Sequence, residues 1–156
     1  MDTNGDTKML LIKDLSSRLP YGVKVINTAD GLNEICELDS IITSRKYKDK
    51  IFVSLTLPDD SVMTGIESIK PYLRPISSMT EEEMDALFDI LYIDKEGKDD
   101  DWIKINDACG IAFFLPTGRY IEEIDKALNY LRSIHIDIVD LIKRGLALEA
   151  PVDMYN

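Results

Sequence analysis

Residues 69–84 read Ile69-Lys-Pro-Tyr-Leu-Arg-Pro-Ile-Ser-Ser-Met-Thr-Glu-Glu-Glu-Met84, and this stretch divides the chain into two parts of different pattern. Its two prolines restrict the backbone between them and predict an extended segment or a single turn. Thr80 is followed three residues later by Glu83, which is the capping-box pattern of a helix start. We therefore expect Tyr72–Arg74 to be a linker between a sheet before it and a helix after it.

Upstream of this linker, the chain has the two-residue period of β-strands. Residues 51–57 give the clearest strand, because Ile51, Val53, Leu55 and Leu57 alternate with Phe52, Ser54 and Thr56. Residues 21–26, 33–43 and 61–65 predict further strands, and the uneven apolar spacing of 33–43 indicates a bulge. Leu11, Leu15 and Leu19 form one stripe of a helix predicted over Thr7–Leu19. This half predicts a four- or five-stranded antiparallel β-meander or an SH3-like partial barrel.

Downstream of the linker, the period changes to that of helices. One helix is expected to begin at Ser78–Glu83, one to cover about Arg119–Ile134, and a short one to cover Ile138–Arg144 with Asp137 as its N-cap. Residues 102–105 fit a strand or a turn, residues 108–115 fit a strand or a helix start, and residues 146–151 predict an extended tail. The fold class is therefore α+β in one domain over residues 1–156, with helix and meander in 7–75 and mainly helices in 76–156.

Charge is distributed unevenly along the chain. Residues 1–78 carry 10 basic and 11 acidic side chains, whereas residues 79–156 carry 8 and 18. An acidic surface repels phosphate backbones, so nucleic acid is a disfavoured partner for the second half. No apolar run reaches the ~20 residues of a membrane helix, and the polar start predicts no signal peptide. We expect a cytoplasmic protein with no membrane partner, in which Cys36 and Cys109 are reduced packing residues.

Catalytic and metal-binding patterns are sparse. His135, Asp137 and Asp140 are spaced as one nitrogen and two oxygen ligands would be, but an aspartate that caps a helix beside a partly buried histidine explains the spacing better. No phosphate-binding, dinucleotide-binding, zinc-protease or nucleophile-elbow motif is present. The sequence therefore predicts no enzyme activity, no metal site and no cofactor.

Two clusters are candidates for binding. Tyr72 and Arg74 are residue types enriched at interface hot spots, and with His135 and Asp137 they form the candidate interaction residues for a protein partner. The alternative cluster is the hairpin tip with Arg45, Lys46, Tyr47 and Lys48, where basic and aromatic side chains together suit nucleic acid. A charged tip that discourages edge-to-edge pairing of strands is the structural explanation of the same residues.

Five segments carry a resemblance to a known family: Leu19-Pro-Tyr-Gly-Val-Lys-Val25, Ile69–Pro75, Ser77–Glu83, His135-x-Asp137, and Gly145-Leu-Ala-Leu-Glu-Ala-Pro151 with Met154-Tyr155. Together they resemble a family of small uncharacterised proteins encoded by prophages and mobile elements of gut bacteria. The resemblance implies an intracellular accessory protein and brings no activity or cofactor. Family members often have a second histidine, an arginine and a glycine where this chain has Ile134, Val139 and Asp140.

The function expected from these observations is a non-enzymatic protein-interaction module of a phage or mobile element. The alternatives are a small-barrel protein that associates with nucleic acid through the tip, and an acidic nucleic-acid mimic that inhibits a host defence protein. The mimic would need carboxylates in a regular row along one face of the second half.

Overall fold

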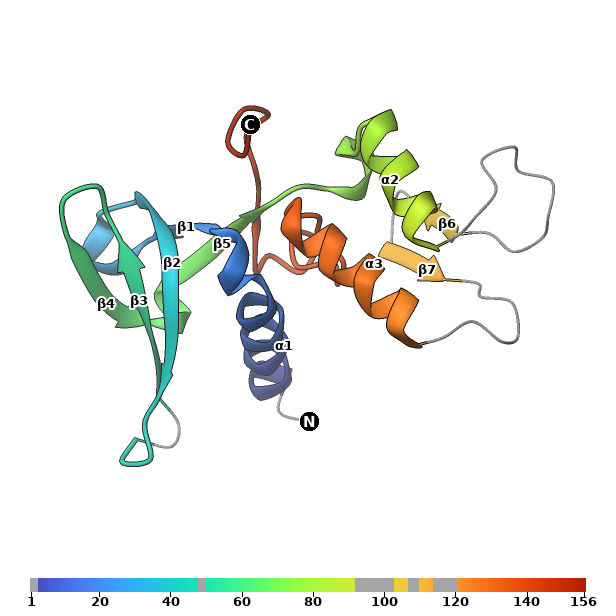
Figure 1. The fold of residues 1–156 in the computed structure, drawn as a ribbon. Coiled ribbons are helices and arrows are strands. Elements are labelled where there is room, and N and C mark those ends of the chain that lie inside the picture. Colours follow the sequence, from blue (N-terminus) through green and yellow to red (C-terminus); the bar gives the residue numbers. More distant parts are fainter. Residues whose placement is uncertain (1–2, 48–49, 92–102, 107–109, 114–120) are drawn as a thin grey trace.

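The computed structural model describes residues 3–47, 50–91, 103–106, 110–113 and 121–156, and it has the mixed α+β fold that the sequence predicts (Figure 1). The helices are α1 (Thr3–Arg18), α2 (Glu81–Leu91) and α3 (Ile121–Ser133). The strands are β1 (Lys24–Asn27), β2 (Glu34–Thr43), β3 (Ile51–Thr56), β4 (Ser61–Gly65), β5 (Ile69–Leu73), β6 (Ile103–Asn106), β7 (Gly110–Phe113) and β8 (Leu148–Glu149).

Six strands form one sheet in the order β4-β3-β2-β1-β5-β8, in which all neighbours are antiparallel except β5 and β8. The meander was expected to have four or five strands, and the difference comes from β5 and β8. The predicted bulge is confirmed, because the register of β2 against β3 shifts between Leu38 and Ser40. The bulge keeps Ile41 opposite Val53, on the same face of the sheet as Leu38 and Leu55.

Residues 72–74 were predicted to be extended or in a turn, and most of them are extended. They do not form a linker outside the sheet, because Tyr72 and Leu73 belong to β5, an interior strand. The hydrogen-bond pattern of the sheet explains why a proline, Pro71, is tolerated in this interior strand. Thr28 N donates to Ser68 O over 2.8 Å, and counting alternate pairs from that bond leaves Val25 and Pro71 as a pair without ladder bonds. Pairing with β8 begins only at Tyr72, so the Pro71 nitrogen replaces no donor that the sheet needs.

The apolar side chains gather in two cores. The first lies between α1 and the sheet, where Leu11 and Leu15 pack with strand residues such as Val25, Leu38 and Leu55. The second lies between α2 and α3 and includes Leu87, Leu91 and Leu131. Figure 1 shows β5 running from the sheet toward α2, and Arg74 at its end pairs with Ile136 in a parallel bridge. The chain segment that leaves the sheet is thus held against the end of α3.

The predicted short helix over residues 138–144 is also wrong, since these residues form turns. Asp140 has φ +60°, a left-handed conformation that an α-helix cannot include. The predicted N-cap role of Asp137 falls with that helix, and its carboxylate instead accepts from the backbone N–H groups of Leu141 and Ile142 in the turn, both at 2.9 Å. Gly145 follows with φ +72°, a left-handed conformation that glycine adopts without strain.

The structure decides between some of the alternatives that the sequence left open for residues 76–156. Residues 103–106 and 110–113 pair as the antiparallel hairpin β6–β7, so a strand is the correct alternative for 110–113. The tail is extended as predicted, and β8 lies parallel to β5. Within the described ranges, none of the helices has the length and apolar character needed to cross a membrane.

Candidate interaction sites

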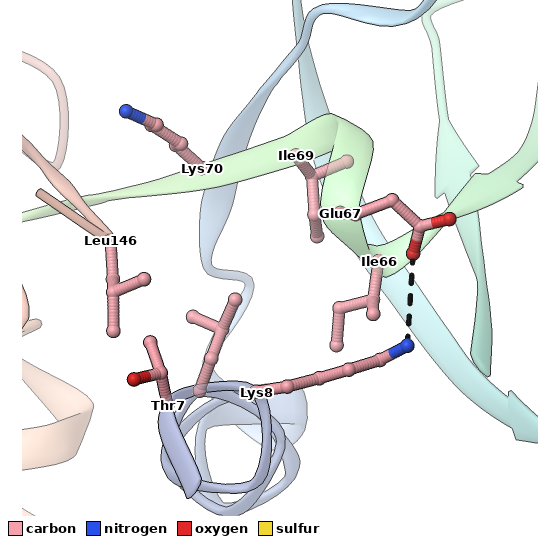
Figure 2. Close-up of a pocket in the computed structure, with 8 residues that line it drawn as sticks. Thr7, Lys8, Ile66, Glu67, Ile69, Lys70 and Leu146 are labelled. Carbon is pink, nitrogen blue, oxygen red and sulfur yellow. Dashed lines mark ion pairs between the residues drawn. The ribbon is translucent and has the colours of Figure 1, made fainter. Parts of the chain in front are cut away.

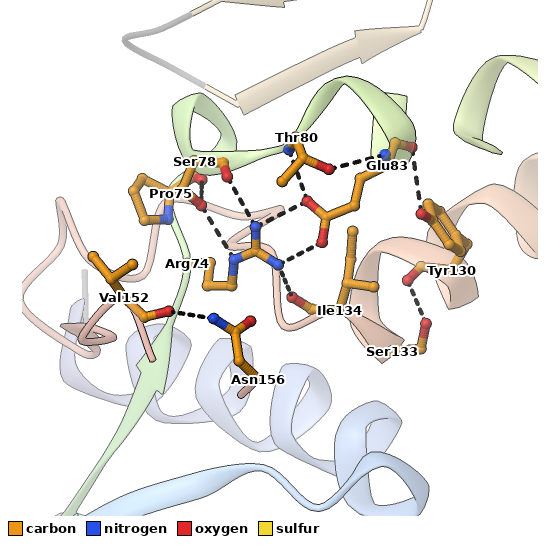
Figure 3. A network of polar contacts seen from close by, with 10 residues as sticks. All are labelled: Arg74, Pro75, Ser78, Thr80, Glu83, Tyr130, Ser133, Ile134, Val152 and Asn156. Carbon is orange, nitrogen blue, oxygen red and sulfur yellow. Dashed lines mark hydrogen bonds and ion pairs between the residues drawn. The ribbon is translucent and has the colours of Figure 1, made fainter. Parts of the chain in front are cut away.

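Arg74 is at the centre of a polar network that fastens β5 to α2 (Figure 3). Its guanidinium donates to both carboxylate oxygens of Glu83, at 2.7 and 2.9 Å, and to Ser78 O at 2.9 Å. Glu83 also accepts from Thr80 N at 2.9 Å, and Thr80 Oγ1 accepts from Glu83 N at 3.2 Å, which confirms the predicted capping box. The hydrogen bonds from Arg74 hold the pKa of Glu83 below its usual range. Arg74 is therefore occupied inside the molecule.

Tyr72 is half-buried and takes part in a latch formed by the C-terminal segment. The hydroxyl of Tyr155 donates to Tyr72 O at 2.7 Å and accepts from Lys24 N at 3.0 Å. Lys24 Nζ donates to Met154 O at 3.0 Å. Burial raises the pKa of Tyr155 to about 12. The latch ties the end of the chain to β1 and β5.

His135 is 5% exposed and has φ +62°. Its ring stacks on that of Tyr155, and its backbone oxygen accepts from Arg74 N at 2.8 Å. Burial, and then the positive charges of Arg18, Arg74 and Lys24, lower the pKa of His135 to about 4, so the ring is neutral at pH 7. Its Nδ1 has no hydrogen-bond partner among the described residues.

Asp137 is buried on the other side of the same backbone bridge. Asp137 N donates to Arg74 O at 2.8 Å, while its carboxylate satisfies the turn described above. The fold thus brings Tyr72, Arg74, His135 and Asp137 together, and their polar groups are largely bonded within the chain. No group of three or more potential metal ligands occurs in the part of the chain that the structure describes.

The pair of Asp14 and Arg18 also belongs to this junction, and it was not identified from the sequence. Arg18 is fully buried, donates to both Asp14 oxygens at 2.7 and 3.0 Å, and reaches Ile136 O at 2.7 Å. The i,i+4 spacing on one helix was an available signal. The latch by Tyr155 had no such signal, because its partners are distant in sequence.

The basic tip is open to solvent, as expected of a hairpin tip. Arg45, Lys46 and Tyr47 are exposed, and Lys46 Nζ lies 5.5 Å from the centre of the Tyr47 ring. Lys48 lies outside the described residues.

The carboxylate row required of a nucleic-acid mimic is short in the described part of the second half. Glu81, Asp85 and Asp89 follow one another at i,i+4 along α2, which spaces them by about 6 Å along the helix axis.

A small hollow lies between α1 and β5 (Figure 2). It has a volume of about 210 Å³, and the apolar side chains of Leu11, Ile66, Ile69 and Leu146 form much of its wall. Lys8 and Glu67 pair across the rim at 4.0 Å, but the Glu67 side chain is 70% exposed, so this ion pair is weak. The hollow has room for a small apolar group.

The outer face of the sheet is turned away from α1, and the C-terminal segment reaches it at Lys24, whose Nζ donates to Met154 O. The strand registers place on it Lys24 and Ile26 of β1, Ile35, Glu37, Ser40 and Ile42 of β2, Phe52, Ser54 and Thr56 of β3, Ser61 and Met63 of β4, and Lys70 and Tyr72 of β5. None of these residues is buried, whereas most inner-face residues are. Ile35 is 52% and Met63 61% exposed. On the outer face, several apolar side chains are therefore at least partly exposed to solvent, with Ser and Thr between them.

A shallow groove of about 410 Å³ lies on this face, lined by outer-face residues that include Lys24, Ile35 and Thr56, with Pro58 at one end. The buried Cys36 also contributes to its wall. Burial, and next the nearby charge of Glu34, raise the pKa of the Cys36 thiol, which keeps it protonated and a poor nucleophile. The groove suits contact with another surface better than covalent chemistry.

Comparison of the chain with protein-family models, with curated proteins and with solved structures gave no match.

Proposed function

We propose that this chain is a non-enzymatic protein-interaction module of a phage or mobile element, that it acts in the cytoplasm, and that it binds a protein partner with the outer face of its sheet. This differs from the expected surface at Tyr72–Arg74, because the Arg74 side chain is bonded to Glu83 and to Ser78 O, whereas the Tyr72 side chain lies on the outer face itself.

The observation that carries the proposal is the apolar character of a sheet face that the described residues leave partly exposed. An antiparallel sheet with one solvated face normally alternates apolar residues inward and polar residues outward. Here Ile26, Ile35, Ile42, Phe52 and Met63 all point outward, on four adjacent strands. An apolar patch with a polar rim is typical of a protein-binding surface.

The experiment is affinity capture from nuclease-treated lysate of the cells that naturally produce the chain. The test variant is Ile35→Asp with Met63→Asp. The matched control is Met9→Asp, because Met9 is 50% exposed and lies on α1, which packs against the opposite face of the sheet. Circular dichroism verifies that both variants fold.

A protein recovered with the wild type and the control, but reduced about tenfold or more with the test variant, supports the proposal. A protein recovered equally with all three contradicts it, since burying a charge in an apolar interface is costly.

The basic tip supports a second candidate, association with nucleic acid, because Arg45, Lys46 and Tyr47 are exposed side by side. Binding of a labelled single-stranded oligonucleotide would then fall steeply with salt and would disappear when Arg45, Lys46, Lys48 and Lys50 are replaced by Ser. Binding unaffected by that change removes the candidate.

A further inference from the structure

Strand β4 is one edge of the sheet, and its backbone is open to a further strand. Leu57 N donates to Asp60 O at 2.8 Å, so these two residues form a hydrogen-bonded pair of the β3–β4 hairpin. Such pairs alternate with pairs whose N–H and C=O groups point away from each other. Counting along the register, the groups of Ser61, Met63 and Gly65 point to the free edge.

The first of these donors is already satisfied, because Ser61 N donates to the side chain of Asp60 at 2.7 Å. Among the described residues, no group accepts a hydrogen bond from the backbone N–H of Met63 or of Gly65. Natural sheets usually protect an edge with charged side chains, proline or a bulge. The five residues of β4, Ser-Val-Met-Thr-Gly, contain no charged residue and no proline.

The charges at the two ends of β4 determine which kind of strand can pair with its free edge. Asp59 and Asp60 precede it and Glu67 follows it, and all three are exposed. A second copy paired antiparallel about Met63 would bring Asp59 of each chain toward Glu67 of the other, and this repulsion disfavours it. A basic segment would instead place its positive side chains near these carboxylates.

We propose that the partner adds to β4 an extended segment, rich in Lys or Arg and in β-branched residues, as a seventh strand. Backbone bonds at Met63 and Gly65 hold the segment, and Asp59 and Glu67 attract its charges. Its outward side chains extend the apolar outer face. This inference rests on the proposed function and names the partner class for the same surface.

The probe is a synthetic ten-residue peptide that alternates Lys with Val and Thr, and the charge control has Glu in place of Lys. The key variant is Met63→Pro, which removes the outward N–H without removing a bond to β3. Its matched control is Met63→Thr, which changes the side chain and keeps the N–H. Isothermal calorimetry measures binding, and thermal melting verifies the fold.

We expect the Lys peptide to bind the wild type and Met63→Thr within about threefold of each other, and Met63→Pro about tenfold more weakly or worse. Asp59→Asn with Glu67→Gln should weaken binding and reduce its salt dependence. The Glu peptide should not bind.

Equal binding to Met63→Pro and Met63→Thr, or no binding to any form, overturns the edge-strand inference. Self-association of the wild type that Met63→Pro abolishes also overturns it, in favour of a second copy. If Met63→Pro does not fold, amide exchange in the wild type decides, because the peptide must slow exchange at Met63 and Gly65. Loss of the captured partner with Ile35→Asp but not with Met63→Pro would leave the proposed function standing and reject only the added strand.

Discussion

The imidazole ring of His135 stacks on the phenol ring of Tyr155, with centroids 3.6 Å apart and planes inclined by 17°. His135 follows α3 and Tyr155 is the second-last residue, so the stack joins the end of the chain to the junction between the two cores. The junction residues stabilise the fold, and variants of them should change stability. Substitutions on the outer face should instead change binding of the partner.

The buried His135 should make stability depend on pH. Its pKa is about 4 in the folded chain and about 6.5 when unfolded, so in this window the unfolded state binds more protons. Stability from this source is present above pH ~6.5 and is lost as the pH falls toward 4, by roughly 3 kcal/mol. Urea unfolding at several pH values measures it.

His135→Asn is the control for this dependence, because Asn tolerates the positive φ and does not titrate in the window. The variant should show a shallower change between pH 6.5 and 4. An unchanged slope would mean that carboxylates elsewhere cause the dependence.

Tyr155→Phe removes only the hydroxyl that bridges Tyr72 O and Lys24 N. We expect a loss of about 1–2 kcal/mol in the free energy of unfolding, since two partly buried backbone groups lose a partner. Tyr47→Phe, at the exposed tip, is the matched control and should change stability by less than ~0.5 kcal/mol. Equal effects of the two substitutions would argue against the latch.

Glu83→Gln weakens the pair with Arg74 while leaving the shape of the side chain nearly unchanged. A loss of about 1–2 kcal/mol is expected at pH 7, with the exposed Glu82→Gln as control. Because the folded pKa of Glu83 is lowered, its contribution is present above pH ~4.3 and is lost as the pH falls below that value. The difference between wild type and Glu83→Gln should therefore shrink at pH 3, as urea unfolding would show; a difference that persists contradicts the charge-based role.

The buried pair of Asp14 and Arg18 should behave as one unit in a double-mutant cycle. Asp14→Leu leaves the Arg18 charge buried and unpaired, which should cost about 3 kcal/mol or more. Adding Arg18→Met should recover part of that loss rather than increase it. Strictly additive effects in chemical unfolding would show that the two residues are not coupled.

The sequence allowed good prediction of features that depend on local pattern. The α+β class, the bulge in β2 and the capping box of Thr80 and Glu83 all follow from periodicity and side-chain spacing. The interior position of β5 could not be read locally, because Pro71 within it and Pro75 just beyond it indicate a joint. Pro71 is accommodated only by the pairing pattern with β1 and β8.

The candidate residues show the same division. Tyr72, Arg74, His135 and Asp137 were predicted as interaction residues for a protein partner, and in the fold their backbone groups make long-range contacts within the chain. The outer face was hidden because its apolar residues lie on four strands, and their common face depends on register across the sheet.

The most direct test of the outer-face account is methyl NMR on a sample labelled at Ile and Met, with and without the captured partner. We predict shifts or broadening at Ile35, Ile42 and Met63, and unchanged signals at Met9 and at Ile76 in the second core. Changes confined to methyl groups of the second core and its surroundings, such as Met79 and Ile138, with the outer face unmoved, would contradict the account.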